Sequence, residues 1–193
     1  MKQFVAQNPD VEIFGMAVLT IAEAMGPMKE MGYKILAESN IENPDPHAWY
    51  KVQDWLNAFK LISEKIGSNT LFLMGQSIPD NIPHDPGQNT LDKALAGINI
   101  SYHMNHRLNG ERLFNIETGR LIDCIGNYKY KRISENNAEM IVDTPYPCDL
   151  EKGIIKKVAS KFMPEVIHYL EIKEKPEECR NNGADSCVYN ISW

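Results

Sequence analysis

Apolar residues recur at helical spacing through the first half of the chain, so this half is expected to be mainly helical. In the segment 47–66 the apolar side chains fall on one face, and Gly67 ends the pattern. The proline-rich stretch 79–89 predicts a loop. The same reasoning predicts helices over residues 10–25, 28–38, 47–66, 69–77 and 90–106.

The second half changes to the alternation of polar and apolar residues that is typical of strands. The run 128–131 alternates in this way, and the polar run 135–137 suits the turn of a hairpin. Helical spacing returns over 149–162, with Asp149 as a cap. Strands are expected over residues 112–116, 121–133, 138–144, 165–173 and 186–193. The sequence therefore predicts an α+β fold, with N-terminal helices packed on an antiparallel sheet that has one inserted helix.

The length of 193 residues fits one domain with a core of its own. We expect a single domain over 1–193, in which 1–45 is an N-terminal helical dimerisation segment and 46–193 is the core. The homodimer prediction rests on a stripe of methionines, because methionine suits adaptable surfaces. The stripe consists of Met16, Met25, Met28 and Met31.

Charge and composition argue against several classes of protein. The net charge is -6 and no broad basic patch is present, so no nucleic acid is expected as a partner. The most apolar run, 13–24, is interrupted and too short to cross a membrane, and no signal-peptide pattern precedes it. Four cysteines do not make a secreted disulfide scaffold in a chain of this size. A cytoplasmic protein without membrane attachment is expected.

Three of the cysteines are candidates for one metal site. Cys148 precedes a predicted helix, whose N-terminal N–H groups favour a thiolate. Cys179 and Cys187 flank a turn, and Glu177 and Glu178 come directly before it. Three thiolates and a carboxylate can complete a tetrahedral zinc site. The alternative is buried cysteines beside an ordinary hairpin turn, and a disulfide is disfavoured in a reducing compartment.

The segment 178–189 resembles the closing motif of 4-vinyl reductase-type domains, which pairs two cysteines around a glycine after a glutamate. Pro145-Tyr146-Pro147 followed by Cys148 and a helix fits the same architecture, and the resemblance covers about residues 90–193. It implies a fold shared with TRAPP-type transport subunits and haem-based nitric-oxide sensors. It also implies a domain that senses aromatic effectors in a buried pocket.

The resemblance further implies a structural zinc ion and its ligands. Its cysteine ligands would be Cys148, Cys179 and Cys187. The fourth ligand would be Glu178, with Glu177 as the alternative register.

Aromatic and histidine side chains of the predicted helices are candidates for the pocket, because such pockets are mostly apolar with few polar groups. The alternative is ordinary core packing or, for the histidines, contact with a helix dipole. A haem sensor of this fold would carry a Tyr-x-Ser-x-Arg run, and its absence disfavours haem but leaves it open. The candidates are Trp49, Trp55, Phe59, Phe72, Tyr102, His103 and His106.

The sequence favours binding or sensing of a small apolar or aromatic molecule, by a protein that signals through a separate partner. An enzyme or accessory protein acting on a tetrapyrrole or haem is the first alternative. A protein-interaction subunit without a ligand is the second. The chain carries no nucleotide-binding loop, serine elbow or zinc-protease motif, so it is not expected to be an enzyme.

Overall fold

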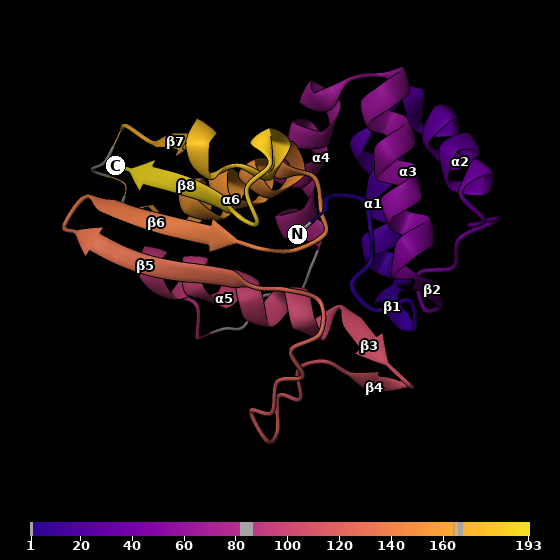
Figure 1. Ribbon diagram of the computed structural model, residues 1–193, viewed down its shortest axis with the longest axis horizontal. Coiled ribbons are helices and arrows are strands. Elements are labelled where there is room, and N and C mark those ends of the chain that lie inside the picture. The colour runs from indigo at the N-terminus through magenta and orange to yellow at the C-terminus, as the bar shows by residue number, and fades with distance from the viewer. Residues whose placement is uncertain (1, 82–86, 164, 166–167) are drawn as a thin grey trace.

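The computed structural model describes residues 2–81, 87–163, 165 and 168–193, and its first part is helical (Figure 1). Helix α3 buries Val52, Leu56 and Phe59 at helical spacing, which is the stripe that predicts it. Within the described residues, no helix has the length and apolar character needed to cross a membrane. The elements are α1 (Gly15–Ala24), the 3-10 turn η1 (Gly26–Met28), α2 (Lys29–Glu38), α3 (Val52–Lys65), α4 (Ser68–Asn81) and α5 (Leu91–Met104).

Short strands replace the ends of three predicted helices, and there the prediction is wrong. They are β1 (Val11–Phe14), β2 (Trp49–Lys51) and β3 (His106–Leu108), which with β4 (Glu111–Arg112) form a sheet of order β2-β1-β3-β4. Ile13 lies opposite both Tyr50 and His106. Partners this distant in sequence leave no trace in local periodicity, so the pairing overrides the helical pattern.

The second sheet and its inserted helix confirm the predicted α+β class. Its strands are β5 (Tyr128–Ser134), β6 (Asn137–Val142), β7 (Glu171–Glu174) and β8 (Cys187–Ser192), all antiparallel in the order β5-β6-β8-β7. Helix α6 (Cys148–Phe162) follows β6, and the 3-10 turns η2 (Pro176–Glu178) and η3 (Arg180–Asn182) precede β8. The predicted strands 112–116 and 121–133 are shorter than expected, because loops fill the rest. The predicted strand 165–173 falls partly outside the described residues, and β7 covers its last part.

Helices α4 and α6 cross in direct backbone contact near the middle of the molecule. A Cβ on Gly75 would lie 2.0 Å from the carbonyl oxygen of Leu150, and one on Gly153 would lie 2.2 Å from that of Phe72. Glycine alone permits such an approach. Figure 1 shows α4 between the N-terminal helices and α6. The two glycines therefore fix where the first turns of α6 lie.

The first residues of the chain connect the two halves of the molecule. The N–H of Phe4 donates to the carbonyl of Pro145 over 2.8 Å, just ahead of α6. The side chain of Gln53 in α3 donates to the Phe4 carbonyl over 3.0 Å and accepts from the Ala6 N–H over 2.9 Å. This segment therefore straps α3 to the start of α6.

Candidate ligand cavity and metal centre

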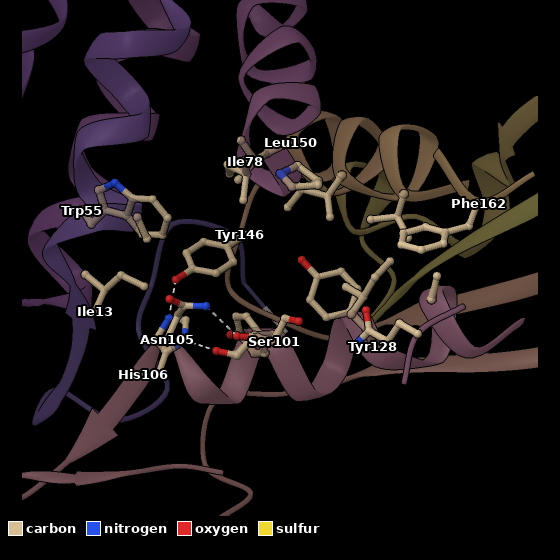
Figure 2. Close-up of a pocket in the computed structure, with 18 residues that line it drawn as sticks. Ile13, Trp55, Ile78, Ser101, Asn105, His106, Tyr128, Tyr146, Leu150 and Phe162 are labelled. Atoms are coloured by element: carbon tan, nitrogen blue, oxygen red, sulfur yellow. Dashed lines mark hydrogen bonds between the residues drawn. The ribbon is translucent and has the colours of Figure 1, made fainter. Parts of the chain in front are cut away.

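A largely apolar cavity lies where the N-terminal helices meet the second sheet (Figure 2). It holds about 730 Å³ of empty space, counted out to its opening. The wall is built from β1, α1, α3, α4, α5, β3, β5 and α6, so residues from most of the chain contribute. Its apolar surface includes Ile13, Trp55, Ile78, Leu150, Ile154 and Phe162. An apolar cavity with a few polar groups is the kind of site that binds small organic molecules.

A histidine–tyrosine pair forms the polar end of the cavity. The Nδ1 of His106 lies 2.6 Å from the carbonyl oxygen of Tyr102, which can only accept, so Nδ1 carries the proton. The Nε2 of His106 is then the acceptor for the hydroxyl of Tyr146 at 2.5 Å, as Figure 2 shows. Burial lowers the pKa of His106 to about 3, so the imidazole is neutral at pH 7. Because the Tyr146 hydroxyl donates its proton to this hydrogen bond, its oxygen can still accept another hydrogen bond.

Aromatic rings pack around this pair. The ring of Tyr102 lies 4.6 Å from His106, 5.4 Å from Tyr128 and 5.6 Å from Tyr146, measured between centroids. The Tyr102 hydroxyl donates to the carbonyl of Ile125 over 2.9 Å. The indole N–H of Trp55 is buried and has no hydrogen-bond partner among the described residues. Gln88, which also lines the cavity, has a buried side-chain Nε2 without a partner in the same part of the chain, so two lining residues carry an unsatisfied donor.

The structure brings three of the seven predicted pocket residues to the cavity, namely Trp55, Tyr102 and His106. Phe59 lies behind Trp55, with ring centroids 4.6 Å apart, and is core. His103 lies outside the lining, with its Nδ1 2.8 Å from the Asn99 carbonyl. The reason is that α5 ends at Met104, so His106 lies in β3 and the two histidines do not share a helical face.

Trp49 and Phe72 lie away from the cavity. Trp49 is in β2, where the guanidinium of Arg107 sits 4.6 Å from its ring. Phe72 lies beneath the ammonium of Lys156, 5.6 Å from the ring centroid. The helical pattern that predicts both for the pocket places aromatic side chains on one face but does not show what that face meets.

Sequence reasoning missed the aromatic residues that the second half contributes. Tyr128 and Tyr146 both line the cavity. The sequence around Tyr146 predicts only a break in the sheet. Tyr128 belongs to a predicted strand, and the strand pattern does not show which way its side chain points. Their role depends on how β5 and the start of α6 pack against α5, which no local signal encodes.

Three sulfur atoms meet beside the first turn of α6. The Sγ atoms of Cys148 and Cys187 are 2.7 Å apart, and that of Cys179 lies 3.9 and 4.0 Å from them. All three side chains are buried. The sequence places them here because Cys148 begins α6 and Cys187 begins β8, opposite Val142 of β6. The convergence that the sequence predicts is therefore present.

The carboxylate in this cluster belongs to Glu174, and not to Glu178 or Glu177. Cys179 Sγ lies 3.0 Å from a carboxylate oxygen of Glu174, and the four ligand atoms are within 4.8 Å of one another. Glu178 instead pairs with Lys175 at 3.3 Å and is half exposed. The turn η2 directs Glu178 outward, while β7 brings Glu174 opposite Tyr189, two residues after Cys187. A turn between neighbouring residues decides this register, and the sequence spacing does not show it.

A buried ion pair supports the cluster from the side of α6. The side chains of Arg180 and Glu151 are 1% and 0% exposed, and the guanidinium donates to the carboxylate. The Nε of Arg180 also donates to Cys187 Sγ over 3.2 Å. Glu151 accepts further hydrogen bonds from Thr144 and from Tyr189. Such charges are stable in the interior only when they are paired and fully hydrogen-bonded.

The thiols differ in acidity because of these neighbours. The hydrogen bond with Cys148, together with the charge of Arg180, lowers the pKa of Cys187 to about 6. The hydrogen bond with Cys187 and burial raise the pKa of Cys148. Burial and the contact with Glu174 raise the pKa of Cys179 to about 12. Cys187 is therefore the most acidic of the three thiols in the absence of a metal.

The donor set suits a thiophilic divalent ion. Zinc–sulfur bonds of about 2.3 Å in a tetrahedron put the sulfurs about 3.8 Å apart. The contacts of Cys179 at 3.9 and 4.0 Å meet that value, whereas Cys148 and Cys187, at 2.7 Å, would separate by about 1 Å on binding. Three sulfurs and one carboxylate oxygen fill all the positions of such a site.

Comparisons with known proteins place the fold. No family model matches the chain, and no curated protein matches its sequence. An H-NOX protein from S. oneidensis, in the Fe(II) ligation state, is 11% identical with a TM-score of 0.63, over 93% of this chain and 95% of that chain. The fold is the H-NOX fold. An oxygen-binding H-NOX domain related to soluble guanylate cyclases is 13% identical with a TM-score of 0.58, over 92% and 91%.

A third structure, described by protein-induced porphyrin distortion that modulates haem redox potential, is 16% identical with a TM-score of 0.62, over 93% and 92%. The predicted relation in fold to haem-based nitric-oxide sensors is thus confirmed. At this identity the H-NOX likeness concerns the fold alone. The resemblance to 4-vinyl reductase-type domains stays a prediction.

The cavity does not present haem with a free axial ligand. Haem iron in this kind of pocket needs an unprotonated ligand atom such as an imidazole nitrogen. Both nitrogens of His106 are engaged, by the Tyr102 carbonyl and by the Tyr146 hydroxyl. The Nε2 of His103 is buried without a partner in the described part of the chain, but His103 is not part of the lining. Haem ligation by His106 would therefore require its unprotonated Nε2 to give up the hydrogen bond from Tyr146.

Proposed function

We propose that this chain is a sensing domain that binds a small apolar or aromatic molecule in the cavity. The observation that carries the proposal is the cavity itself, with its apolar wall and one polar end. The H-NOX fold supports it, because one neighbour with this fold is described as an oxygen-binding domain.

The polar groups of the wall narrow the chemistry of the ligand. The Tyr146 oxygen donates to His106 and is left as an acceptor, so it favours a ligand hydroxyl or N–H group. The buried N–H of Trp55 is an unsatisfied donor that a ligand acceptor would satisfy. A flat apolar body with one group that both donates and accepts fits this pattern.

Calorimetric titration with 2-naphthol and with naphthalene tests the proposal. We expect 2-naphthol to bind about tenfold more tightly, which corresponds to roughly 1.4 kcal/mol for the hydroxyl contact. Ile98→Trp fills the cavity and should abolish binding, while Leu73→Trp, on a side chain that is 51% exposed, should not. Equal binding of 2-naphthol by Ile98→Trp, with the fold intact by circular dichroism, would rule out the cavity as the site.

Haem is the alternative ligand that the H-NOX fold suggests, and its binding can be tested separately. Because both nitrogens of His106 are engaged, we expect titration with haemin to give no stoichiometric Soret band. A one-to-one complex with an axial imidazole spectrum that disappears in His106→Gln would make haem the preferred ligand and the small apolar or aromatic molecule the alternative.

We propose further that the thiol cluster holds a structural zinc ion on Cys148, Glu174, Cys179 and Cys187. The role is structural because protein ligands fill every tetrahedral position. A bound ion would cross-link α6, β7 and the turn ahead of β8. Zinc supplies no catalytic chemistry in this arrangement.

Elemental analysis of the purified protein tests the zinc proposal. One zinc per chain is expected, with loss in Cys179→Ser. Cys124→Ser is the matched control, because Cys124 is a free, half-buried thiol outside the cluster. A chain that is metal-free and fully stable would remove the zinc centre and leave the cavity proposal unaffected.

A homodimer through residues 1–45 stays part of the proposal, as does a separate signalling partner. Met16, Met28 and Met31 are 39%, 45% and 45% exposed, as a docking surface requires. Met25 is 4% exposed, so its place in the predicted surface is wrong, because it packs into the core. Sedimentation of the wild type and of a variant with Met28→Glu and Met31→Glu tests the dimer. A monomeric wild type would rule it out.

A further inference from the structure

The cluster has a partner on its inner side that the four ligands do not account for. The side-chain Nε of Arg180 lies 3.2 Å from Cys187 Sγ, and the backbone N–H of the same residue donates to that sulfur over 3.4 Å. A second guanidinium nitrogen is 3.9 Å from Cys148 Sγ. One residue thus supplies two donors to one sulfur and approaches another.

The guanidinium is held firmly in this position. Glu151 accepts from Nη2, the same nitrogen that lies near Cys148 Sγ, and Thr144 and Tyr189 in turn donate to Glu151. The Tyr189 hydroxyl also donates to the Cys148 carbonyl over 2.9 Å. Since Arg180 and Glu151 are 1% and 0% exposed at the side chain, no water competes for these contacts. The remaining nitrogen, Nη1, is buried without a partner among the described residues, so the guanidinium keeps donor capacity.

A metal bound by three thiolates and a carboxylate leaves the centre with excess negative charge in a buried place. That charge is costly unless hydrogen-bond donors or cations stabilise the ligand atoms. Arg180 is the cation that contacts the sulfurs in the described part of the chain. Donation to a ligating sulfur draws electron density from it and fixes its orientation.

We propose that Arg180 is a positioning residue of the metal centre, acting through Cys187 and held in place by Glu151. The inference rests on the proposed zinc site, of which it names a supporting part. It predicts that loss of Arg180 weakens metal binding and makes the Cys187 thiolate more electron-rich. A residue that merely packs against the cluster would change neither the electronic character of the thiolate nor its recovery by a conservative replacement.

Cobalt substitution gives the decisive readout, because thiolate-to-cobalt charge transfer reports the electron density on sulfur. We expect the wild type to bind one Co²⁺ with tetrahedral d–d bands and a near-ultraviolet charge-transfer band. Arg180→Met should move that band to longer wavelength and lower zinc affinity about 10- to 100-fold in chelator competition. Arg180→Lys, which keeps the charge and one donor, should recover part of both effects.

Controls separate the possible failures. Arg132→Met removes an arginine that pairs with Asp92 at the surface and should behave as the wild type. Glu151→Gln keeps the side-chain shape and loosens the guanidinium, so it should give a smaller shift of the same sign and serves if Arg180→Met does not fold. Unchanged band and affinity in Arg180→Met or, in its place, in Glu151→Gln would overturn the role of Arg180 and leave the zinc site standing. A wild type that binds neither cobalt nor zinc would overturn both.

Discussion

The cavity and the thiol cluster lie on different faces of the first turns of α6. The polar groups of the cavity are neutral, whereas those of the cluster include charged groups. Leu150 and Ile154 line the cavity, while Cys148 and Glu151, three residues apart, face the cluster. The polar groups of the cavity are neutral, as in His106, whose pKa is lowered to about 3 by burial. The cluster instead buries a charged pair beside its sulfurs.

The contrast between neutral and ionised groups explains how one helix can serve two sites. Neutral polar groups need only a matched donor and acceptor to be tolerated in an apolar wall. Ionised groups need a complete set of partners, and each partner removed exposes the next to an uncompensated charge. The cluster should therefore be fragile towards single substitutions, whereas the cavity should tolerate them and leave its polar end free for a ligand.

The largest effect is expected for Glu151→Ala. The substitution leaves the guanidinium of Arg180 buried without its carboxylate, which typically costs about 3–5 kcal/mol of unfolding free energy. Urea unfolding followed by circular dichroism measures the loss. Glu38→Ala is the control, because Glu38 pairs with Lys65 at 2.5 Å but both side chains are about half exposed. The control should lose about 0.5 kcal/mol or less, and similar losses in both variants would contradict the contrast between the two regions.

A smaller effect is expected when the cavity is titrated with acid. Unfolded histidine has a pKa near 6.5, whereas that of His106 in the folded chain is about 3. Between these values the unfolded chain binds a proton that the folded chain does not, so stability is present above pH 6.5 and is lost as the pH falls. From pH 7 to pH 5 the contribution of this group should fall by about 2 kcal/mol.

Comparison with His106→Gln isolates that contribution. Burial also lowers the pKa of His103, which acts in the same direction but is present in both proteins. The loss of stability between pH 7 and pH 5, measured by urea unfolding, should be about 2 kcal/mol smaller in the variant. An equal loss in both proteins would mean that His106 is protonated in the folded state.

The sequence predicts a site better when the residues that form it lie close together along the chain. The cluster draws on residues from 148 to 187, within one sheet and its inserted helix, so the cysteines could be predicted to meet. The carboxylate ligand could not be predicted, because the turn η2 directs Glu178 away from the cluster that Glu174 faces. The cavity draws on pairings such as Ile13 with His106, across most of the chain. Periodicity predicts which faces are apolar, but not which faces meet.

The smallest effect is expected for Tyr146→Phe, which removes a neutral donor from the same histidine. The variant leaves His106 Nε2 buried without its partner, at a cost of roughly 1.5 kcal/mol in unfolding free energy. Tyr169→Phe, on a side chain that is 57% exposed, should change stability by about 0.5 kcal/mol or less. A loss in Tyr146→Phe as large as that in Glu151→Ala would show that the histidine–tyrosine pair behaves as a charged pair. The polar end of the cavity would then be unsuited to a neutral ligand, because an ionised imidazole would need an anion beside it.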